Sequence, residues 1–317
     1  MEDYPRTQAE FDTRFATAEA CRAYLATLRW ANGFRCPRCG EHKSWALSTG
    51  RTRCAACGRQ TSVTAGTIFQ DSRAPLTMWF RAMWYVASQK TGTSALGLQH
   101  VLGLGSYETA WTWLHKLRRA MVRPGRDRLT GRVEVDETYL GAEEAGIRGR
   151  RSLRKSLIGV AVEYSGRRLG RVRLRHIVDA SADSLQGFID EVVEPGSIVH
   201  TDGWLGYERA NAAHGYRHRI TFVSDHPEPA HELLPRVHLV VSLLKRWLLG
   251  THQGAISPAH LDYYLDEFTF RFNRRRSRHR GKLFFRLAEQ AVQVEPAPYR
   301  ALIKHVPRRR PGRKHKI

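Results

Sequence analysis

Two acidic side chains stand at the ends of short runs of β-forming residues. Asp136 closes the run that begins at Val133, and Asp202 closes the run that begins at Ile198. A third polar side chain, His238, follows after 35 intervening residues in a segment with helical character. Two carboxylates on strands and a third donor on a helix form a set that can hold divalent metal ions against a phosphodiester. These three residues are therefore the candidate metal ligands.

The acids around Asp136 have different expected positions. Glu134 and Asp136 are two residues apart on a strand and share one face, whereas Glu137 points to the other face. We favour Asp136 as the ligand and interpret Glu134 as a neighbour or a structural acid. Asp202 has a second interpretation, because Asp-Gly is a common turn dipeptide. Its combination with Asp136, the order of the elements and the charge of the chain favour a catalytic position.

The composition favours a polyanionic partner. The 317 residues contain 52 Lys and Arg against 30 Asp and Glu, which gives a formal net charge of +22. Nucleic acid is the natural counter-ion for this excess, although ribosomal and membrane-surface proteins can be equally basic. The chain has no run of 18 apolar residues, and its acidic, polar start does not resemble a secretory signal. We therefore expect a cytoplasmic, nucleoid-associated protein without a membrane partner.

Four of the five cysteines form a C-x2-C-x14-C-x2-C pattern, namely Cys36, Cys39, Cys54 and Cys57. Each pair can turn two thiolates toward one ion, and two pairs complete a tetrahedral zinc site. Because four thiolates leave no open coordination position, we expect the zinc to be structural. Four unrelated buried cysteines or a redox pair are the alternatives, and both fit the spacing less well. The fifth cysteine, Cys21, lies in a predicted helix and is expected in the core.

The segment 75–123 predicts helices, because apolar residues recur at helical spacing. A short helix, a turn at Gly103 and a second helix opened by the N-cap candidate Ser106 have the outline of a helix-turn-helix. An ordinary helical hairpin is the alternative, since no base-reading residue stands out.

From about residue 131 to 287 the pattern changes to mixed strands and helices. The expected elements are strands at 133–135, 157–164 and 171–178, a helix at 184–193 and a strand from 197 to 200. The third strand alternates basic with apolar residues, which predicts that it is half-exposed. Three strands, a helix and a fourth strand suit an RNase H-like core, which carries its first acid on the first strand and its second just after the fourth.

Several motifs occur in order along the chain and carry a resemblance. After the two cysteine pairs come VEVDETYLG at 133–141, TDGWLGY at 201–207, LLKRWLLGTH at 243–252 and YLDEFTFRFNRR at 264–275. Over residues from about 15 to 290 the chain resembles bacterial insertion-sequence transposases of the zinc-ribbon, ISXO-like DDE-type family. The resemblance implies an RNase H-like domain that cuts at transposon ends and joins the freed 3′-hydroxyls to target DNA, using Mg2+ or Mn2+.

The resemblance also implies the ligand set. Asp136 and Asp202 match the first two acidic positions, and His238 stands at the third position, commonly Glu, seven residues before the motif lysine Lys245. A neutral imidazole adds no negative charge, which shifts the preference from Mg2+ toward Mn2+; it can also orient a water or the leaving group. In the alternative, His238 faces DNA and another acid is the third ligand. The available acids are Glu232, Asp266 and Glu267.

Basic residues cluster where a DNA strand could run. They fall in a loop after Asp136, on the segment that carries Lys245, and within 271–282. The candidate DNA contacts are Arg148, Arg150, Arg151, Lys155, Lys245, Arg246, Arg274, Arg275 and Arg276. For Lys245 and the loop, a merely solvated surface is the alternative. The basic tail 307–317 is expected to be disordered when unbound.

The expected architecture is an α/β chain in which a small zinc ribbon and a helix-turn-helix-like segment precede an RNase H-like catalytic core. The expected boundaries are 1–72 for the N-terminal helix and zinc ribbon, 73–125 for the helix-turn-helix-like segment, 130–290 for the catalytic domain and 291–317 for the basic tail.

The leading functional hypothesis is metal-dependent cleavage and strand transfer on double-stranded DNA. A homodimer or larger oligomer is expected, because two transposon ends must be held together. One alternative is a catalytically inactive or domesticated zinc-ribbon DNA-binding protein. The other is an RNase H-like nuclease that does not transfer strands.

Overall fold

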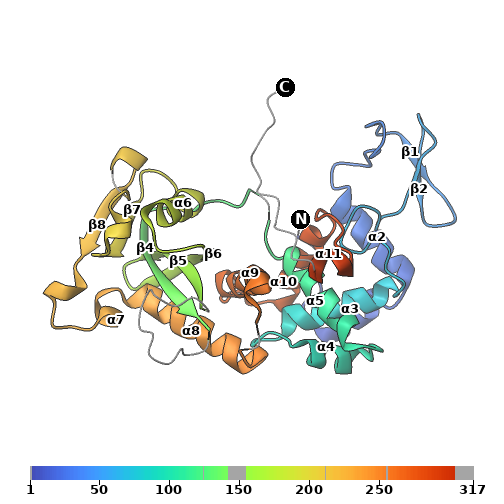
Figure 1. The fold of residues 1–317 in the computed structure, drawn as a ribbon. Coiled ribbons are helices and arrows are strands. Elements are labelled where there is room, and N and C mark those ends of the chain that lie inside the picture. The colour runs from blue at the N-terminus through green and yellow to red at the C-terminus, as the bar shows by residue number, and fades with distance from the viewer. Residues whose placement is uncertain (1, 124, 142–154, 211, 255, 304–317) are drawn as a thin grey trace. The chain divides into compact units, whose positions relative to one another are not determined.

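The computed structural model describes residues 2–123, 125–141, 155–210, 212–254 and 256–303 (Figure 1). The chain divides into two compact units. Unit 1 contains the chain up to Pro124 and again from Arg276, and unit 2 contains Gly125–Arg275. The chain therefore returns to unit 1 for its last helices. Within the described part, none of the helices is both long and apolar enough to cross a membrane.

Unit 1 combines a small antiparallel ribbon, in the order β1-β2-β3, with a group of helices. Its elements are α1 (Gln8–Arg14), α2 (Ala18–Arg29), β1 (Ser44–Ala46), β2 (Thr52–Cys54), β3 (Gln60–Thr61), α3 (Leu76–Ser88), α4 (Ala95–Leu102), α5 (Tyr107–Arg119), α10 (Arg280–Ala291) and α11 (Tyr299–Ile303). The helix predicted around Cys21 is confirmed as α2, and Cys21 is fully buried.

The two helices of the helix-turn-helix outline are present, with the predicted turn at Gly103 and the predicted N-cap at Ser106. The side chain of Ser94 accepts a hydrogen bond from the N–H of Gly97 at the start of α4, and Ser106 accepts one from Thr109 at 3.2 Å at the start of α5. Between the helices, Gly103 has a φ of 62°, a left-handed conformation that favours glycine.

The position of α10 differs from the expected domain boundary. The sequence pattern placed residues up to 290 in the catalytic domain, but α10 packs against α2 and α3 in unit 1. The reason is aromatic packing: the ring of Phe284 lies 5.5 Å from that of Phe11 and 5.7 Å from that of Phe80. All three side chains are buried.

Unit 2 is built on a five-stranded sheet in the order β6-β5-β4-β7-β8. Its principal elements are β4 (Arg132–Leu140), β5 (Ser156–Ser165), β6 (Arg168–Ile177), α6 (Ala182–Val192), β7 (Ile198–Asp202), β8 (Arg217–Thr221), α7 (Ala230–Leu233), α8 (Pro235–His252) and α9 (Leu261–Asn273). The strands β4, β5 and β6 pair antiparallel, while β7 runs parallel to β4 and to β8. The predicted strands and helix are thus confirmed, with longer bounds.

Helices cover both faces of this sheet, and Figure 1 shows α6 and α8 on opposite sides of it. Val133 and Val135 of β4 belong to the apolar cluster that includes α6. Val160 of β5 belongs to a second cluster, formed with α8 and α9. Alternate residues of β4 therefore face different helices, and the even-numbered acids Glu134 and Asp136 lie on the α8 side.

The third strand of the sheet is more buried than its sequence indicated. Val172 and Leu174 of β6 pack with α8 and α9, as expected for its apolar positions. Arg173, expected on an exposed face, is only 5% exposed. Its guanidinium donates hydrogen bonds to the main-chain oxygens of Val172 and Asp127. The prediction of a half-exposed strand was wrong, because α6 also packs against β6.

Side chains from α9 complete the outer edge of the sheet at β6. The amide of Asn273 accepts a hydrogen bond from the N–H of Val172 at 2.8 Å and donates one to the carbonyl of the same residue. The carboxylate of Asp262 accepts from the N–H of His176 at 3.1 Å. Arg275, just after α9, donates to the carbonyls of Leu169 and Gly170.

Candidate active site and metal centre

The sheet brings the two predicted acidic ligands to the same level of neighbouring strands. In the parallel pair of β4 and β7, Glu134 lies opposite His200. Continued by two residues, this register puts Asp136 beside Asp202, the last residue of β7. Paired residues of neighbouring strands point to the same face, and the strands lie about 4.8 Å apart. Both carboxylates therefore face the side that α8 covers.

The third predicted ligand comes from α8. The Nε2 atom of His238 is 3.8 Å from Oδ2 of Asp136. The side chain of His238 is 33% exposed and that of Asp136 is 17% exposed. Both groups can therefore be reached from solvent while much of each side chain is covered by protein.

The surroundings of His238 favour a neutral imidazole. Burial lowers the pKa of His238, and the charges of His231 and Lys245 lower it further, against the opposing effects of Glu134 and Asp202. A neutral ring keeps a nitrogen lone pair for a cation. The same electrostatic effects show that Asp202 and Lys245 are close enough to act on the His238 ring.

Main-chain N–H groups orient the two aspartates. Oδ1 of Asp136 accepts a hydrogen bond from the N–H of Glu137 at 2.8 Å, and Oδ1 of Asp202 accepts one from Trp204 at 3.1 Å. Glu137 itself turns to the α6 side, where it accepts a hydrogen bond from the hydroxyl of Tyr207 at 2.6 Å. The structure thus separates Glu137 from Asp136, as the strand period predicted.

Glu134, the other acid on the same face of β4 as Asp136, binds the first residues of α8. Its side chain is fully buried, and its Oε2 atom accepts hydrogen bonds from the N–H groups of Arg236 and Val237 at 2.9 and 3.2 Å. The guanidinium of Arg236 forms an ion pair with the same carboxylate. Glu134 is therefore a structural acid in this fold.

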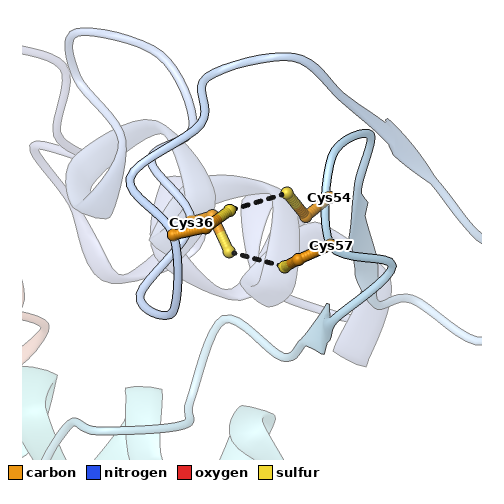
Figure 2. A group of neighbouring side chains, drawn as sticks. Cys36, Cys54 and Cys57 are labelled. Atoms are coloured by element: carbon orange, nitrogen blue, oxygen red, sulfur yellow. Dashed lines mark hydrogen bonds between the residues drawn. The ribbon is translucent and has the colours of Figure 1, made fainter.

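The four ribbon cysteines form a separate and tighter centre (Figure 2). The Sγ atoms of Cys36 and Cys57 are 3.6 Å apart, and those of Cys39 and Cys54 are 3.5 Å apart. A tetrahedral zinc with Zn–S bonds of about 2.3 Å separates its sulfur ligands by about 3.8 Å, so the cysteines fit this ion. All four sulfurs lie within 4.8 Å of one another. Among the described residues, no acid or histidine group is gathered as closely.

One thiol of this centre is prepared for ionisation. Burial opposes ionisation of Cys36, but hydrogen bonds to its sulfur from the backbone of Cys39 and Arg38 and from the thiol of Cys57 lower its pKa to about 6. The pKa of Cys39 shifts the other way: a hydrogen bond from the backbone of Glu41 favours its thiolate, but the neighbouring sulfurs of Cys57 and Cys54 disfavour it and raise the pKa to about 12. The thiolate is the form that binds metal.

Family models match the two parts of the chain that contain these centres. Residues 128–273 match the ISXO2-like transposase domain, and residues 16–60 match the transposase zinc-ribbon domain. Over both ranges the chain is similar to transposases of this family. It is 26% identical over 282 residues to an uncharacterized protein in transposable element ISH50 of Halobacterium salinarum, across 81% of this chain and 91% of that protein. This relative is archaeal, whereas the sequence resemblance pointed to bacterial elements.

A comparison with solved structures adds nothing to the assignment. The transposase overlaps a chain from the structure of a simian T-cell lymphotropic virus intasome in complex with PP2A regulatory subunit B56 gamma, at 16% identity and a TM-score of 0.30. The overlap covers 60% of this chain and 65% of that chain. A likeness of this size carries no argument about fold or function.

The other acids considered for the third ligand of the transposase lie elsewhere in unit 2. Glu232 is exposed on the short helix α7. Asp266 and Glu267 are buried on α9, among buried aromatic residues of the same helix. Glu267 pairs with the guanidinium of Arg271 at 2.8 Å. His238, by contrast, lies 3.8 Å from Asp136.

The candidate DNA contacts fall into three groups. Lys245, Arg246 and Arg276 are exposed, and Lys155 is half-buried. Arg274 and Arg275 are partly used by the fold. Arg275 donates hydrogen bonds to three main-chain carbonyls, and each guanidinium stacks on an aromatic ring of α9. Arg148, Arg150, Arg151 and the tail 307–317 lie outside the described residues.

Unit 1 of the transposase has a hollow of its own, with a volume of about 650 Å³. Thr109, Thr112 and Lys116 of α5 line one side, and residues 70–74 and 296–298 line the others. No residue of the acidic site borders it. This face of α5 therefore borders a hollow instead of forming an open convex surface.

Sequence reasoning missed two residues that shape the acidic site, Arg236 and Tyr207. The signal for Arg236 was present, because Pro235 marks a helix start and the next N–H groups need acceptors. No comparable signal pointed to Tyr207, whose hydroxyl is directed at Glu137 only through the packing of the buried tyrosine.

Proposed function

We propose that this transposase uses Asp136, Asp202 and His238 to hold divalent cations while it cuts the ends of an insertion sequence and joins them to target DNA. The observation that carries the proposal is the distance of 3.8 Å between His238 and Asp136. It is supported by the parallel register of β4 and β7, whose last pair, Glu134 and His200, lies two residues before the two aspartates. The match to the ISXO2-like domain supports a transposition reaction in general terms.

We also infer that unit 2 is an RNase H-like core. The support is its topology: three antiparallel strands, a helix, and two strands parallel to the first, in the order β6-β5-β4-β7-β8. β4 and β7 are the first and fourth strands of the unit. They carry Asp136 and Asp202, at the positions where such a core has its first two acids.

The donor set fits Mg2+ or Mn2+. Carboxylate oxygens suit both hard cations, whereas imidazole is a softer donor that favours Mn2+ relative to Mg2+. A set of two carboxylates and one neutral imidazole also has one negative charge fewer than three carboxylates. We therefore expect the enzyme to use Mn2+ more effectively than Mg2+.

The reaction itself places negative charge on the attacking, leaving and non-bridging oxygens of a phosphodiester. Bound divalent cations would stabilise this charge and help to activate water or a 3′-hydroxyl. Asp136, Asp202 and His238 would hold them. Lys245, on the same helix as His238, would bind a phosphate of the DNA strand.

Double-stranded DNA is the proposed partner. The formal net charge of +22 and the exposed cations Lys245, Arg246 and Arg276 support phosphate contacts, as does the half-buried Lys155. Two transposon ends must be held together for strand transfer, which requires at least two copies of the chain. The zinc of the ribbon is structural in this proposal, because its four thiolates leave no position for substrate.

Two alternative functions make different predictions. A catalytically inactive DNA-binding protein would tolerate loss of the aspartates, and the histidine at the third position would then mark a decayed site. A nuclease without strand transfer would cut cognate ends but never join them. The clustered carboxylates disfavour the first alternative, since negative charge next to DNA weakens simple binding.

The test is strand transfer of a labelled transposon-end duplex into a plasmid with Mn2+ or Mg2+. Wild type is compared with Asp202→Asn, His238→Ala and the control Glu194→Gln. Glu194 is an exposed acid that precedes the N-terminal end of β7, whereas Asp202 lies at its C-terminal end. We expect joined product from wild type and Glu194→Gln and none from Asp202→Asn.

Each other outcome has a distinct meaning. Cutting without joining would support the nuclease, and binding without cutting of cognate ends would support the DNA-binding protein. Joining by His238→Ala at the wild-type rate would remove His238 from the ligand set.

A further inference from the structure

The helix that carries His238 begins without a cap of its own. Leu234, the residue before α8, makes no side-chain cap hydrogen bond, and Pro235 at the first helical position has no N–H. The next N–H groups, those of Arg236 and Val237, have no acceptor within the helix. They need an acceptor from another element, unlike those of α4 and α5, which are capped by their own serines.

Glu134 of β4 supplies that acceptor. Its Oε2 atom accepts from the N–H of Arg236 at 2.9 Å and from that of Val237 at 3.2 Å. The Glu134 side chain is 0% exposed, so the two bonds are shielded from water. A carboxylate at this position also complements the positive end of the helix dipole. A residue of the sheet thus performs the role that Ser or Asp usually has at the start of a helix.

The side chain of Arg236 extends this connection. Its guanidinium pairs with Glu134, and its Nη2 atom donates to the carbonyl of Gly166 at 2.8 Å. The same guanidinium lies 4.0 Å from the ring centroid of Tyr164. The first turn of α8 is therefore attached both to β4 and to the turn between β5 and β6.

The connected segments are the ones that carry two proposed ligands. Asp136 is two residues after Glu134 on the same face of β4, and His238 directly follows Val237 on α8. The distance from His238 Nε2 to Asp136 Oδ2 is 3.8 Å. The hydrogen bonds of Glu134 therefore fix the position of His238 relative to Asp136. His238 is one residue beyond the bonded Val237 on the helix, and Asp136 is two residues beyond Glu134 on the strand.

We propose that Glu134 is a positioning residue of the cation site: it fixes the start of α8 so that His238 and Asp136 can contact the same divalent cation. The proposal rests on the proposed function, in which these two residues are ligands. Removing a group that orients a metal ligand commonly weakens metal binding about 10- to 100-fold. The competing explanation is that the buried pair of Glu134 and Arg236 only stabilises unit 2.

Glu134→Gln separates the two explanations, because it keeps the size and one acceptor oxygen but loses the charge that pairs with Arg236. Glu163→Gln is the matched control. Glu163 of β5 also accepts from two main-chain N–H groups, those of Thr130 at 3.0 Å and Arg171 at 3.3 Å, and pairs with the Arg171 guanidinium. It lies on the face of the sheet that α6 covers, away from His238.

The measurement is the affinity of the zinc-loaded full chain for Mn2+ alone. Binding is monitored by the loss of the electron paramagnetic resonance signal of free Mn2+. We expect Glu134→Gln to weaken Mn2+ binding at least about tenfold. Glu163→Gln leaves Mn2+ binding unchanged, although both substitutions lower the melting temperature. In a His238→Ala background, Glu134→Gln adds less than about a twofold further loss, because its effect acts through His238.

The possible contrary results are distinct. The same loss from Glu134→Gln with and without His238, or an equal loss from Glu163→Gln, would reduce the role of Glu134 to stability and overturn the proposal. Unchanged Mn2+ binding in Glu134→Gln would overturn it as well. Wild type that binds no Mn2+ would overturn both the positioning role and the ligand assignment. Mn2+ binding that depends on His238, without any strand transfer, would count only against the proposed reaction.

A second variant covers the case in which Glu134→Gln does not fold. Glu134→Asp keeps the charge but shortens the side chain by one methylene, which moves the acceptor without removing it. We expect Glu134→Asp to weaken Mn2+ binding. In the His238→Ala background the same substitution should cause no further loss. Wild-type Mn2+ affinity in this variant would show that Mn2+ binding does not depend on the position of the start of α8 relative to Asp136.

Discussion

The two candidate metal centres of this chain are built in opposite ways. The ribbon takes its four candidate ligands from residues 36–57, and their sulfur atoms lie within 4.8 Å of one another. The acidic site takes its proposed ligands from two strands and a helix spread over residues 136–238, and they are less closely gathered. A local, closed centre can hold its metal as a structural part. An open site assembled by sheet register and helix placement leaves room for substrate, but its geometry depends on the whole of unit 2.

The largest expected effect is that of Asp136→Asn, which tests whether the open site works independently of the ribbon. Cleavage should fall by at least about 10³-fold, since bound metal contributes several kcal/mol to phosphoryl transfer and each 1.4 kcal/mol is a factor of ten. Zinc content, measured by atomic absorption, and end binding, measured by gel shift, should stay at the wild-type level. Cleavage at the wild-type rate would remove Asp136 from the site, and loss of zinc would show that the two centres are coupled.

Cys36→Ser tests the same comparison from the other side. We expect release of the zinc and unfolding of the ribbon, because a closed site with three thiolates loses most of its binding free energy. Mn2+ binding by unit 2 should persist, while binding of transposon ends weakens. The control is Cys21→Ala, which changes the buried fifth cysteine and should retain zinc. A Cys36→Ser protein with full zinc content would contradict the assignment of the ribbon centre.

His238→Glu sharpens the contrast within the acidic site by replacing the imidazole with a third carboxylate. The ratio of Mg2+-supported to Mn2+-supported strand transfer should rise roughly tenfold, because a third carboxylate adds a hard oxygen donor and a negative charge. The control is His231→Glu, which adds the same charge on α7, close enough to act on His238. An equal rise in the control would mean that charge alone, rather than ligation, sets the preference.

The smallest expected effect is that of Lys245→Ala on DNA binding. If Lys245 contacts one phosphate, the slope of log affinity against log salt should decrease by about 0.9. The effect should be uniform across DNA sequences, as measured by fluorescence anisotropy at several salt concentrations. Lys282→Ala is the comparison, because Lys282 already pairs with Glu2 in unit 1. Unchanged salt dependence in Lys245→Ala would make Lys245 a solvated cation of α8.

The sequence predicted the parts of this protein that depend on short-range pattern. The cysteine spacing identified the ribbon, the serine at 106 marked the start of α5, and the period of β4 separated Asp136 from Glu137. The strand expected at 197–200 was also found, as β7, and Asp202 is its last residue.

The sequence did not predict features that arise from packing between distant segments. The alternation of basic and apolar residues in β6 suggested solvent on one face, but Arg173 is buried there and donates a hydrogen bond to the carbonyl of Asp127, in the segment before β4. The hydrogen bonds from the guanidinium of Arg275, a candidate DNA contact, to the carbonyls of β6 were not predicted either. The capping role of Glu134 likewise requires knowledge of which strand lies under the start of α8.

The bonds between Asn273 and Val172 have a consequence for how the chain folds. An uncovered edge strand can pair with another molecule and start aggregation. At β6 the amide of Asn273 occupies the place of such a strand, but it comes from a residue 101 positions later in the chain. Contacts of this separation form late. Until α9 has been synthesised and has docked, nascent unit 2 exposes a strand that other chains can join, so conditions that delay α9 should favour inclusion of the protein in aggregates.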